Sequence, residues 1–427
     1  MALQLKDLGF RDVYALKGGY REWVRANYPV EKKWTARPEC VTCHATVTPG
    51  IVADWKASKH SESEVTCSVC HGELHMSEED VHKAGRMKPE RCAMCHQVQW
   101  DQFKGGKHAL AWTAMKAMPT AHRQPVALMD GMKGCGGCHK LGLKTEMEIQ
   151  ALREAGAGFG LASCDACHTR HTFSAKEAQQ PQACQTCHMG FDHAQWEMYS
   201  SSKHGVRYSL KQKGILPESA VAPTCQTCHM REGHHGVMTG WGFLAVRSPM
   251  PEDKKWAEAR TVVLKALGLL DPEGKPTPRL EVIKAIDMMR LTQETWQKER
   301  DKVVKVCSTC HSRSFAGEEL EKADRMIREA DLVMAEAILT VADLYKEGIL
   351  QRPKSYAYPF PDLFSFHDSP TLIEQRLYIM FFEQRMRTFQ GAFHANPDYT
   401  LWYGWSAMKT SLVEIKTMAE DLRRKRN

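Results

Sequence analysis

Every one of the 16 cysteines in this 427-residue chain belongs to a Cys-x-x-Cys-His motif, and the motif occurs eight times. A chain that repeats two thiols and an adjacent imidazole at this spacing must fold around whatever those groups bind. The motif cysteines are Cys40, Cys43, Cys67, Cys70, Cys92, Cys95, Cys135, Cys138, Cys164, Cys167, Cys184, Cys187, Cys225, Cys228, Cys307 and Cys310. The motif histidines are His44, His71, His96, His139, His168, His188, His229 and His311.

Cys-x-x-Cys-His is the attachment signature of c-type haem. The two thiols form thioethers with the porphyrin vinyl groups, and the histidine ligates the iron. Structural zinc sites would use four-cysteine sets without an obligatory histidine after each second cysteine. A disulfide framework would not need that histidine either. The sequence therefore predicts eight covalently bound haem c groups.

Bound haem also changes what the net charge of the chain implies about its partners. The formal net charge of +7 would by itself favour an acidic partner or nucleic acid. A ferric haem with two propionates adds about −1, so eight haems bring the holoprotein to about −1. We therefore expect no nucleic-acid binding. No run of about 18 apolar residues occurs, so no membrane span is expected.

Haem c is attached outside the cytoplasm, so we expect a periplasmic or otherwise extracytoplasmic protein. The opening "MALQLKDLGF" lacks the basic start and the apolar run of a signal peptide, and we expect the precursor to begin upstream of Met1. Residues 5–31 predict a helix, a strand over Val13–Leu16, a turn at Gly18 and Gly19, and a second helix before Pro29. They resemble the C-terminal end of a rhodanese domain. No cysteine precedes them to carry sulfur, so sulfur transfer is not expected.

The predicted fold is mainly α, in three segments: a rhodanese-like remnant (1–31), an octahaem domain with the porphyrins as core (32–315), and a C-terminal helical domain (316–427). Residues 252–306 predict two helices broken by "DPEGKPTP". After His311, apolar residues recur at helical spacing, towards Gly348 and towards the final "RRKRN". A bundle core explains these stripes most simply, and subunit association through long helices is the alternative. The stripe residues are Leu320, Ile327, Met334, Val341, Met408, Leu412, Ile415, Ala419 and Leu422.

Twelve histidines lie outside the motifs and are candidates for a second axial ligand. Electron-transfer haems usually have such a ligand, whereas a catalytic haem keeps one face open. On this count all eight haems could be capped. Met189 and Met230 directly follow their own motifs and cannot reach the opposite face.

The chain resembles the octahaem hydroxylamine oxidoreductases (HAO) and their reductive relatives. The resemblance rests on "CDACHTRHTFSAKEAQQPQACQTCHMGFDHAQWEMYSSSKHG" (164–205), "APTCQTCHM" (222–230), "CSTCHSRSFA" (307–316) and "HANPDY" with "GW" (394–405), and it covers residues 36–425. It implies seven bis-histidine haems and a five-coordinate, catalytic fourth haem on Cys135, Cys138 and His139. The implied distal ligands are His60, His82, His108, His171, His204, His235 and His394. His234 could replace His235. We expect His75, His122 and His367 at the surface.

Asp192 and His193 match the Asp-His pair that the family places over the open iron face. Interconversion of nitrite, hydroxylamine and ammonium moves protons with electrons, and a histidine paired to a carboxylate can shuttle protons near neutral pH. The alternative is that the two residues only tie down the loop after the sixth motif.

The direction of the reaction depends on departures from the oxidase. There, a tyrosine from a neighbouring subunit is cross-linked to the catalytic porphyrin after "HxNP", next to paired glycines. Here the chain reads "HANPDYTLWYGW", and neither Tyr399 nor Tyr403 aligns with that tyrosine. A second active-site tyrosine is replaced by Trp241 and Phe243. The resemblance therefore implies a nitrogen-oxide reductase that acts on nitrite or hydroxylamine, works as a homotrimer and receives electrons from a cytochrome c or a quinol-linked donor.

Two alternatives remain open. One is oxidation of hydroxylamine or hydrazine in the same site. The other is a pure electron-transfer cytochrome, which would need an eighth distal histidine, such as His122, over the fourth iron.

Overall fold

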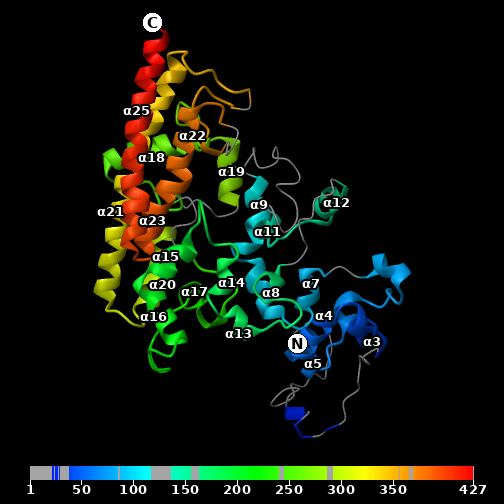
Figure 1. Ribbon diagram of the computed structural model, residues 1–427. Helices are drawn as coiled ribbons and strands as arrows, with labels where there is room; N and C mark the ends of the chain where they lie inside the picture. Colours follow the sequence, from blue (N-terminus) through cyan, green and yellow to red (C-terminus); the bar gives the residue numbers. More distant parts are fainter. Residues whose placement is uncertain are drawn as a thin grey trace, which may run out of the picture. The chain divides into compact units, whose positions relative to one another are not determined.

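The computed structural model describes residues 22–23, 25–26, 28, 38–84, 87–116, 136–154, 163–239, 245–285, 292–354, 356–364 and 369–426. Within these ranges the regular structure is helical, and the one strand-like pairing is an isolated antiparallel bridge between Leu270 and Pro276 (Figure 1). The predicted mainly α fold is confirmed. Over the same ranges, no helix is both long and apolar enough to cross a bilayer. Nearly all of the rhodanese-like segment lies outside the described residues, as do His122 and His367.

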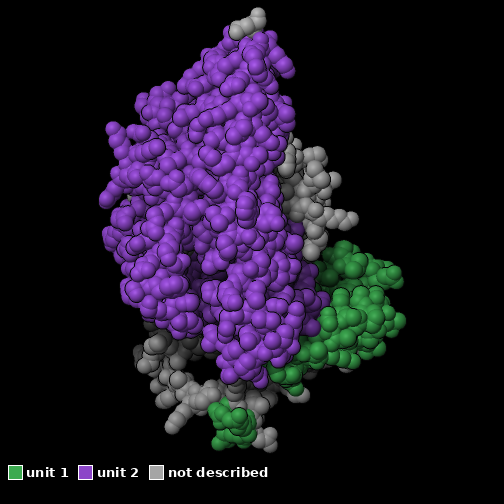
Figure 2. Space-filling view, turned by 60° about the vertical axis from the view of Figure 1, so that its left-hand side comes forward, with its two compact units in different colours: residues 1–85 green, residues 86–427 purple. Residues whose placement is uncertain are grey.

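The chain forms two compact units, Met1–Gly85 and Arg86–Asn427 (Figure 2). Unit 1 is built from short helices: α3 (Pro38–Val47), α4 (Pro49–Lys56), α5 (Lys59–Glu62), α6 (Cys67–His71) and the 3₁₀ helix η1 (Glu78–Lys83). Pro49 opens α4, and Ser58 caps α5 by accepting the Ser61 N–H at 3.2 Å. Val52 is the one buried aliphatic side chain among the described residues of unit 1. Protein atoms alone therefore give this unit almost no apolar core.

The first part of unit 2 is also a succession of short helices joined by loops. They are α7 (Pro89–Ala93), α8 (Gln97–Lys104), η2 (His108–Leu110), α9 (Ala111–Lys116), α11 (Gly136–His139), α12 (Glu146–Glu154), η4 (Cys164–Ala166), α13 (Ala175–Ala178), α14 (Gln182–Gln185), α15 (Gln195–Ser201), α16 (Lys203–Gln212), α17 (Cys225–His229) and η5 (Arg231–Gly233). Their described residues include only one small buried apolar cluster, formed by Phe103, Ala109 and Leu141.

The rest of unit 2 is made of longer helices with a conventional core. They are α18 (Lys254–Ala266), α19 (Pro278–Ala285), α20 (Gln293–Cys307), α21 (Arg313–Lys346), α22 (Leu372–Ile379), the π-helical turn η7 (Met380–Arg385), α23 (Met386–Phe393), α24 (Pro397–Thr400), the π-helical turn η8 (Leu401–Ser406) and α25 (Ala407–Arg426). Helix α21 packs against α18, α23 and α25.

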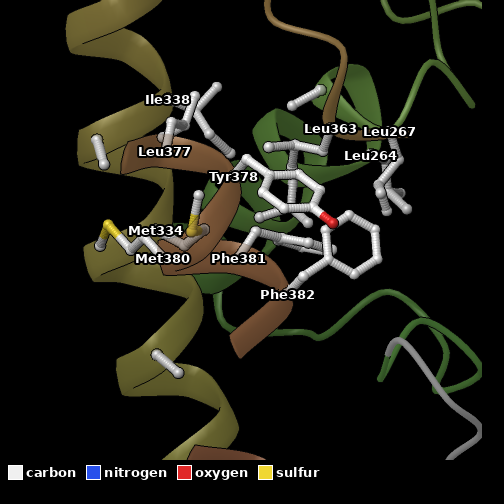
Figure 3. Close-up of a cluster of buried hydrophobic side chains, with 14 of the residues drawn as sticks. Leu264, Leu267, Met334, Ile338, Leu363, Leu377, Tyr378, Met380, Phe381 and Phe382 are labelled. Atoms are coloured by element: carbon white, nitrogen blue, oxygen red, sulfur yellow. The ribbon is translucent and has the colours of Figure 1, made fainter. Parts of the chain in front are cut away.

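The predicted helical stripes line this core. The four stripe residues of α21 are buried, and so are all those of α25 except Leu422, which is partly exposed and packs against the core. Side chains of α18, α21 and α22 meet in one cluster, which Figure 3 shows around Tyr378 and Phe382. The predicted ends are confirmed as well, because α21 stops at Lys346 just before Gly348, whose φ is +67°, and α25 runs to Arg426.

The break predicted at "DPEGKPTP" is confirmed. Helix α18 ends at Ala266, and a tight turn around Gly274 (φ +88°) is closed by the Leu270–Pro276 bridge. The second predicted helix differs, since α19 and α20 are separate elements with residues 286–291 between them outside the described ranges. The predicted boundary at 315/316 falls inside α21, which begins at Arg313 with Ser312 as its cap. The three-segment division stays a prediction.

We predict that Gly404→Ala destabilises the C-terminal helices. A Cβ atom on Gly404 would lie 2.6 Å from the backbone nitrogen of Thr388 on α23, and backbone cannot move aside as a flexible side chain can. Overpacking of this kind costs about 1–3 kcal/mol. The midpoint of thermal unfolding, followed by far-ultraviolet circular dichroism, should fall by several degrees.

The matched control is Gly317→Ala in α21, where the added Cβ meets no heavy atom within 4 Å. Alanine favours a helix by about 1 kcal/mol over glycine, so this variant should unfold at the same temperature or higher. An equal loss in both variants would contradict the close packing of η8 on α23.

Candidate haem centres and active site

The described motifs each wind into a single helical turn. The motif histidine donates its backbone N–H to the carbonyl of the first cysteine, for example from His96 to Cys92 at 2.8 Å and from His311 to Cys307 at 3.0 Å. Positions i, i+3 and i+4 share one face of such a turn, so the spacing aims both thiols and the imidazole to the same side. In the fourth motif Cys135 lies outside the described residues.

Four motif histidines of unit 2 each face a histidine ring from a distant segment. With metal–nitrogen bonds of about 2 Å, two imidazoles on opposite sides of one metal have ring centroids roughly 6 Å apart. The observed separations therefore fit an iron between each two rings. The pairs are His188 with His108 at 6.1 Å, His168 with His235 at 6.3 Å, His311 with His204 at 6.2 Å and His229 with His394 at 6.4 Å.

The other ring nitrogen of several histidines is held by the protein. Nδ1 of His229 donates to the carbonyl of Met238 at 2.7 Å, and Nδ1 of His394 donates to that of Gln390 at 2.7 Å. A carbonyl can only accept, so the hydrogen lies on Nδ1 and the lone pair on Nε2 is left for a metal. Cys-x-x-Cys-His geometry, ring separations and fixed tautomers together fit haem c.

The sequence left open which of two adjacent histidines is the distal ligand, and the structure distinguishes them. His235, and not His234, pairs with His168, while His234 is exposed and accepts the Gly236 N–H on Nδ1 at 3.1 Å. Of the other expected ligands, His60 lies half-buried in α5, and His171 lies half-buried three residues after its nearest motif.

His75 in unit 1 was not among the ligands expected from the sequence, but its position makes it a candidate. Its ring centroid lies 6.0 Å from that of His44, and its Nδ1 donates to Asp80 Oδ1 at 2.9 Å. His75 was expected at the surface but is half-buried, whereas His82, expected as a ligand, is exposed. The available signal was "SEED" directly after His75 and Met76, a capping sequence that brings a carboxylate back towards the histidine.

Asp80 is well suited to orient His75. The backbone N–H groups of Ser77 and Met76, together with the ring of His75, lower the pKa of Asp80 to about 2 against the opposing effect of desolvation. The ionised carboxylate accepts the Nδ1–H of His75 and so leaves the lone pair on Nε2 for a metal.

The fourth motif differs from those with paired rings. Nδ1 of His139 donates to the Ala111 carbonyl at 3.1 Å, which again leaves Nε2 for a metal. Among the described residues, no histidine ring faces His139 at the distance seen in the other pairs. His193 and Asp192 nevertheless lie close enough to His139 to interact with it electrostatically. The side chains of Cys138 and Cys187 are also in hydrogen-bonding contact, so the fourth and sixth motifs adjoin.

The loop that carries Asp192 and His193 is fastened at several points. The Trp196 N–H bonds back to the His188 carbonyl at 2.8 Å, and the Gly190 N–H bonds to Glu197 Oε1 at 2.8 Å. From α23, Gln390 Nε2 donates to the Asp192 carbonyl at 3.4 Å. The loop is thereby closed on itself and tied to the C-terminal helices.

Within this loop His193 donates Nδ1–H to Asp192 Oδ1. Burial lowers the pKa of His193, but the hydrogen bond and the charge of Asp192 raise it more, so that the pKa lies above its ordinary value. The His193 ring therefore keeps its proton to a higher pH than it would without Asp192. Its side chain is 33% exposed, which leaves the pair within reach of a small molecule.

The thiols also show which motifs are neighbours. Side-chain contacts join Cys92 to Cys164 and Cys184 to Cys225, besides the contact between Cys138 and Cys187. The third motif therefore adjoins the fifth, and the sixth adjoins both the fourth and the seventh.

Tyr399 of α24 and Tyr403 of η8, which follow "HANP", have tilted rings whose centroids lie 5.1 Å apart. Tyr403 is exposed. Trp241 and Phe243, which take the place of the second family tyrosine, lie outside the described residues.

A sequence profile for the family described as "Seven times multi-haem cytochrome CxxCH" matches residues 63–262 and 282–357, well over half of the chain. The chain belongs to this multihaem cytochrome family. A profile for cytochrome c554 and c-prime also matches residues 17–72. Covalently bound haem c, predicted from the motifs, is therefore confirmed for this multihaem cytochrome.

Its relatives are HAO-like, as the sequence predicted. A protein of Kuenenia stuttgartiensis, named a probable nitrite reductase-hydroxylamine oxidoreductase fusion protein, is 28% identical over 483 residues, which cover 91% of this chain and 52% of that protein. The multihaem cytochrome thus spans about half the length of this curated relative.

Two solved structures share the fold. A reducing HAO-like protein complex of Kuenenia stuttgartiensis matches with a TM-score of 0.67 and 26% identity, over 90% of this chain and 85% of that one. A hypothetical multiheme protein matches with a TM-score of 0.63 and 20% identity, over 95% and 98%, and speaks for the fold alone.

We predict that His75→Ala creates one high-spin haem. Loss of an axial imidazole leaves a haem with a single protein ligand, which electron paramagnetic resonance and the optical spectrum detect as a new high-spin ferric signal. His82→Ala is the matched control, because it removes an exposed histidine of the same unit and should leave the spectrum unchanged. A new high-spin signal in His82→Ala, with none in His75→Ala, would restore the original ligand assignment.

Proposed function

We propose that this multihaem cytochrome is an oxidoreductase that reduces nitrite, hydroxylamine or both to ammonium at its fourth haem. One observation carries the proposal: His139 has no facing histidine ring among the described residues, while the Asp192–His193 pair lies close enough to act on it electrostatically. A binding face without a second protein ligand, next to a proton donor, is what such a reaction needs.

The proposed complement is eight haem c groups, seven bis-histidine and one five-coordinate. The distal ligands are those implied by the resemblance, with His75 in place of His82. They are His60, His75, His108, His171, His204, His235 and His394. The ring separations of five of these with motif histidines support the assignment.

Haem bound at the fourth motif would supply an iron that takes a small nitrogen ligand on its open face and exchanges electrons with it. His139 would hold that iron through Nε2, with its ring oriented by the Ala111 carbonyl. His193, held by Asp192 through Nδ1 and by a hydrogen bond to the backbone of Cys187, would pass a proton from its protonated ring to the substrate. Asp192 stabilises the imidazolium and so keeps a proton available near neutral pH.

Electrons would reach the fourth haem through the sixth. The contact of Cys187 with Cys138 joins the sixth motif to the fourth, and the contact of Cys184 with Cys225 joins it to the seventh. Cys187 also lies near Cys167 of the fifth motif, and Cys307 lies near Cys228 of the seventh. These neighbours support two branches, third–fifth and eighth–seventh, that converge on the sixth haem.

The relatives support both the substrate class and the direction. One carries nitrite reductase and hydroxylamine oxidoreductase in its name, and the HAO-like complex is described as reducing. The altered sequence after "HANP" supports an uncrosslinked, reductive fourth haem. We further propose an extracytoplasmic homotrimer that takes electrons from a cytochrome c or a quinol-linked donor.

We predict that the purified holoprotein, supplied anaerobically with a reduced dye, forms ammonium from nitrite or hydroxylamine. The same preparation should oxidise hydroxylamine more slowly with an electron-accepting dye. Ammonium from neither substrate would refute the reductase, and faster oxidation than reduction would reverse the proposed direction. If the protein exchanges electrons with the dyes but converts neither nitrite nor hydroxylamine, it is an electron carrier and not a reductase.

We predict that His193→Asn retains eight haems and lowers ammonium formation roughly 100-fold or more, because a positioned general acid contributes about 10²–10⁴-fold. Pyridine haemochrome content and mass spectrometry count the haems, and turnover is measured with reduced dye. His204→Asn is the matched comparison from the same segment. It should add a high-spin signal, since the ring of His204 faces that of His311. A new high-spin signal in His193→Asn would instead make His193 an iron ligand.

A further inference from the structure

A half-buried lysine follows the fourth motif. His139 ends α11, and Lys144 stands in the short loop between that helix and α12. Burial lowers the pKa of the Lys144 ammonium to about 8, against the opposing effect of the Glu148 charge. A group with this pKa is still mostly protonated at neutral pH. The protein therefore keeps a positive charge in a poorly solvated position next to this motif.

This ammonium is held by main-chain carbonyls and by an aromatic ring. Its Nζ donates to the carbonyl of Gly142 at 2.9 Å and to that of Lys140 at 3.3 Å. It also lies 5.2 Å from the centre of the Trp112 ring, within the range of a cation–π interaction. No carboxylate of the described residues forms an ion pair with it, and Glu148 instead accepts from the N–H and the hydroxyl of Thr145 at 2.8 and 2.9 Å. The positive charge is therefore not neutralised by a contacting group.

The segment that faces Lys144 also orients the motif histidine. Nδ1 of His139 donates to the carbonyl of Ala111, and Trp112 is the next residue. The loop between His139 and Lys144 packs closely on this segment, because a Cβ atom on Gly142 would collide with the backbone nitrogen of Trp112. Burial lowers the pKa of His139, and the charge of Lys144 lowers it further. The ammonium is thus within electrostatic range of the histidine that would hold the fourth iron.

We infer that Lys144 is a positioning residue of the fourth haem, and that its charge raises the reduction potential of the iron that His139 would hold. Ferric iron carries one more positive charge than ferrous iron, so a nearby cation disfavours the oxidised state. The effect is larger at a half-buried position than at the surface, since water screens the charge less. Electrons that arrive from the sixth haem would therefore collect at the fourth. The inference rests on the proposed function, in which substrate is reduced at this haem.

The test is redox potentiometry of the holoprotein, in which paramagnetic resonance and optical spectra follow the high-spin haem separately from the low-spin haems. Lys144→Gln keeps a hydrogen-bond donor for the loop carbonyls but removes the charge, so the midpoint potential of the high-spin haem should fall. Lys144→Arg keeps the charge and should leave that midpoint close to the wild-type value. A lysine that only braced the loop would not separate the two variants according to charge.

The matched control is Lys265→Gln in α18. Lys265 is also half-buried and donates from Nζ to a loop carbonyl, that of Pro272 at 2.7 Å, but it belongs to the C-terminal helices and not to a haem motif. This variant should leave every midpoint unchanged. Unchanged midpoints in a folded Lys144→Gln protein would overturn the inference, and so would an equal fall in Lys144→Gln and Lys144→Arg.

A second measurement needs no variant. An experimental structure of the wild-type holoprotein should show Nζ of Lys144 bound to the Gly142 carbonyl, and an Nζ turned out into solvent would overturn the inference. Neither readout involves nitrite or hydroxylamine, so the inference can fail in a protein that forms ammonium. If the fourth haem proves to be low-spin, the proposed open face is refuted, and the shift in Lys144→Gln should then fall on a single low-spin haem.

Discussion

The facing histidine rings are the long-range contacts on which the haem-bearing part of unit 2 depends. His229 meets His394, and His204 meets His311, so that loops and short helices are joined to segments far along the chain. Ordinary apolar packing could not do this, because buried aliphatic side chains are concentrated after residue 245. The helices before that point are too short to be stable without tertiary partners. The apolar faces of the porphyrins are the surfaces that can bury them.

The C-terminal helices have a second role besides forming a conventional core. Gln390 on α23 binds the carbonyl of Asp192, and Asn396 Nδ2 binds the Met198 carbonyl at 2.8 Å and Ser201 Oγ at 2.7 Å. The loop with the Asp192–His193 pair and the helix that follows it are therefore held by α23 and by the turn after it. A change in how η8 packs on α23 would be transmitted to the proposed proton donor through these bonds.

The sequence predicted correctly those structural features that depend only on neighbouring residues. The motifs, the turn around Gly274 and the ends of α21 and α25 all follow from spacing, glycine and helical periodicity. The resemblance supplied His108, His204, His235 and His394, which do face motif histidines. It named His82 and not His75, although the ring of His75 is the one near His44, and this placement depends on Asp80 turning back to hold the imidazole. The buried ion pairs of Asp331 with Arg260 and Arg385 were not foreseen, since no sequence pattern reveals which charges a bundle will bury together.

His188 shows why ring separation alone does not assign a ligand. The rings of His108 and His193 both lie 6.1 Å from it, and each could accompany an iron by that measure. His193, however, belongs to the same closed loop as His188 and meets its ring edge-on at 87°. His108 reaches His188 from a separate helix, as a ligand on the opposite face must. With Nδ1 bound to Asp192 and a further hydrogen bond to the backbone of Cys187, His193 is held close to His139, whose ring faces no second histidine ring among the described residues.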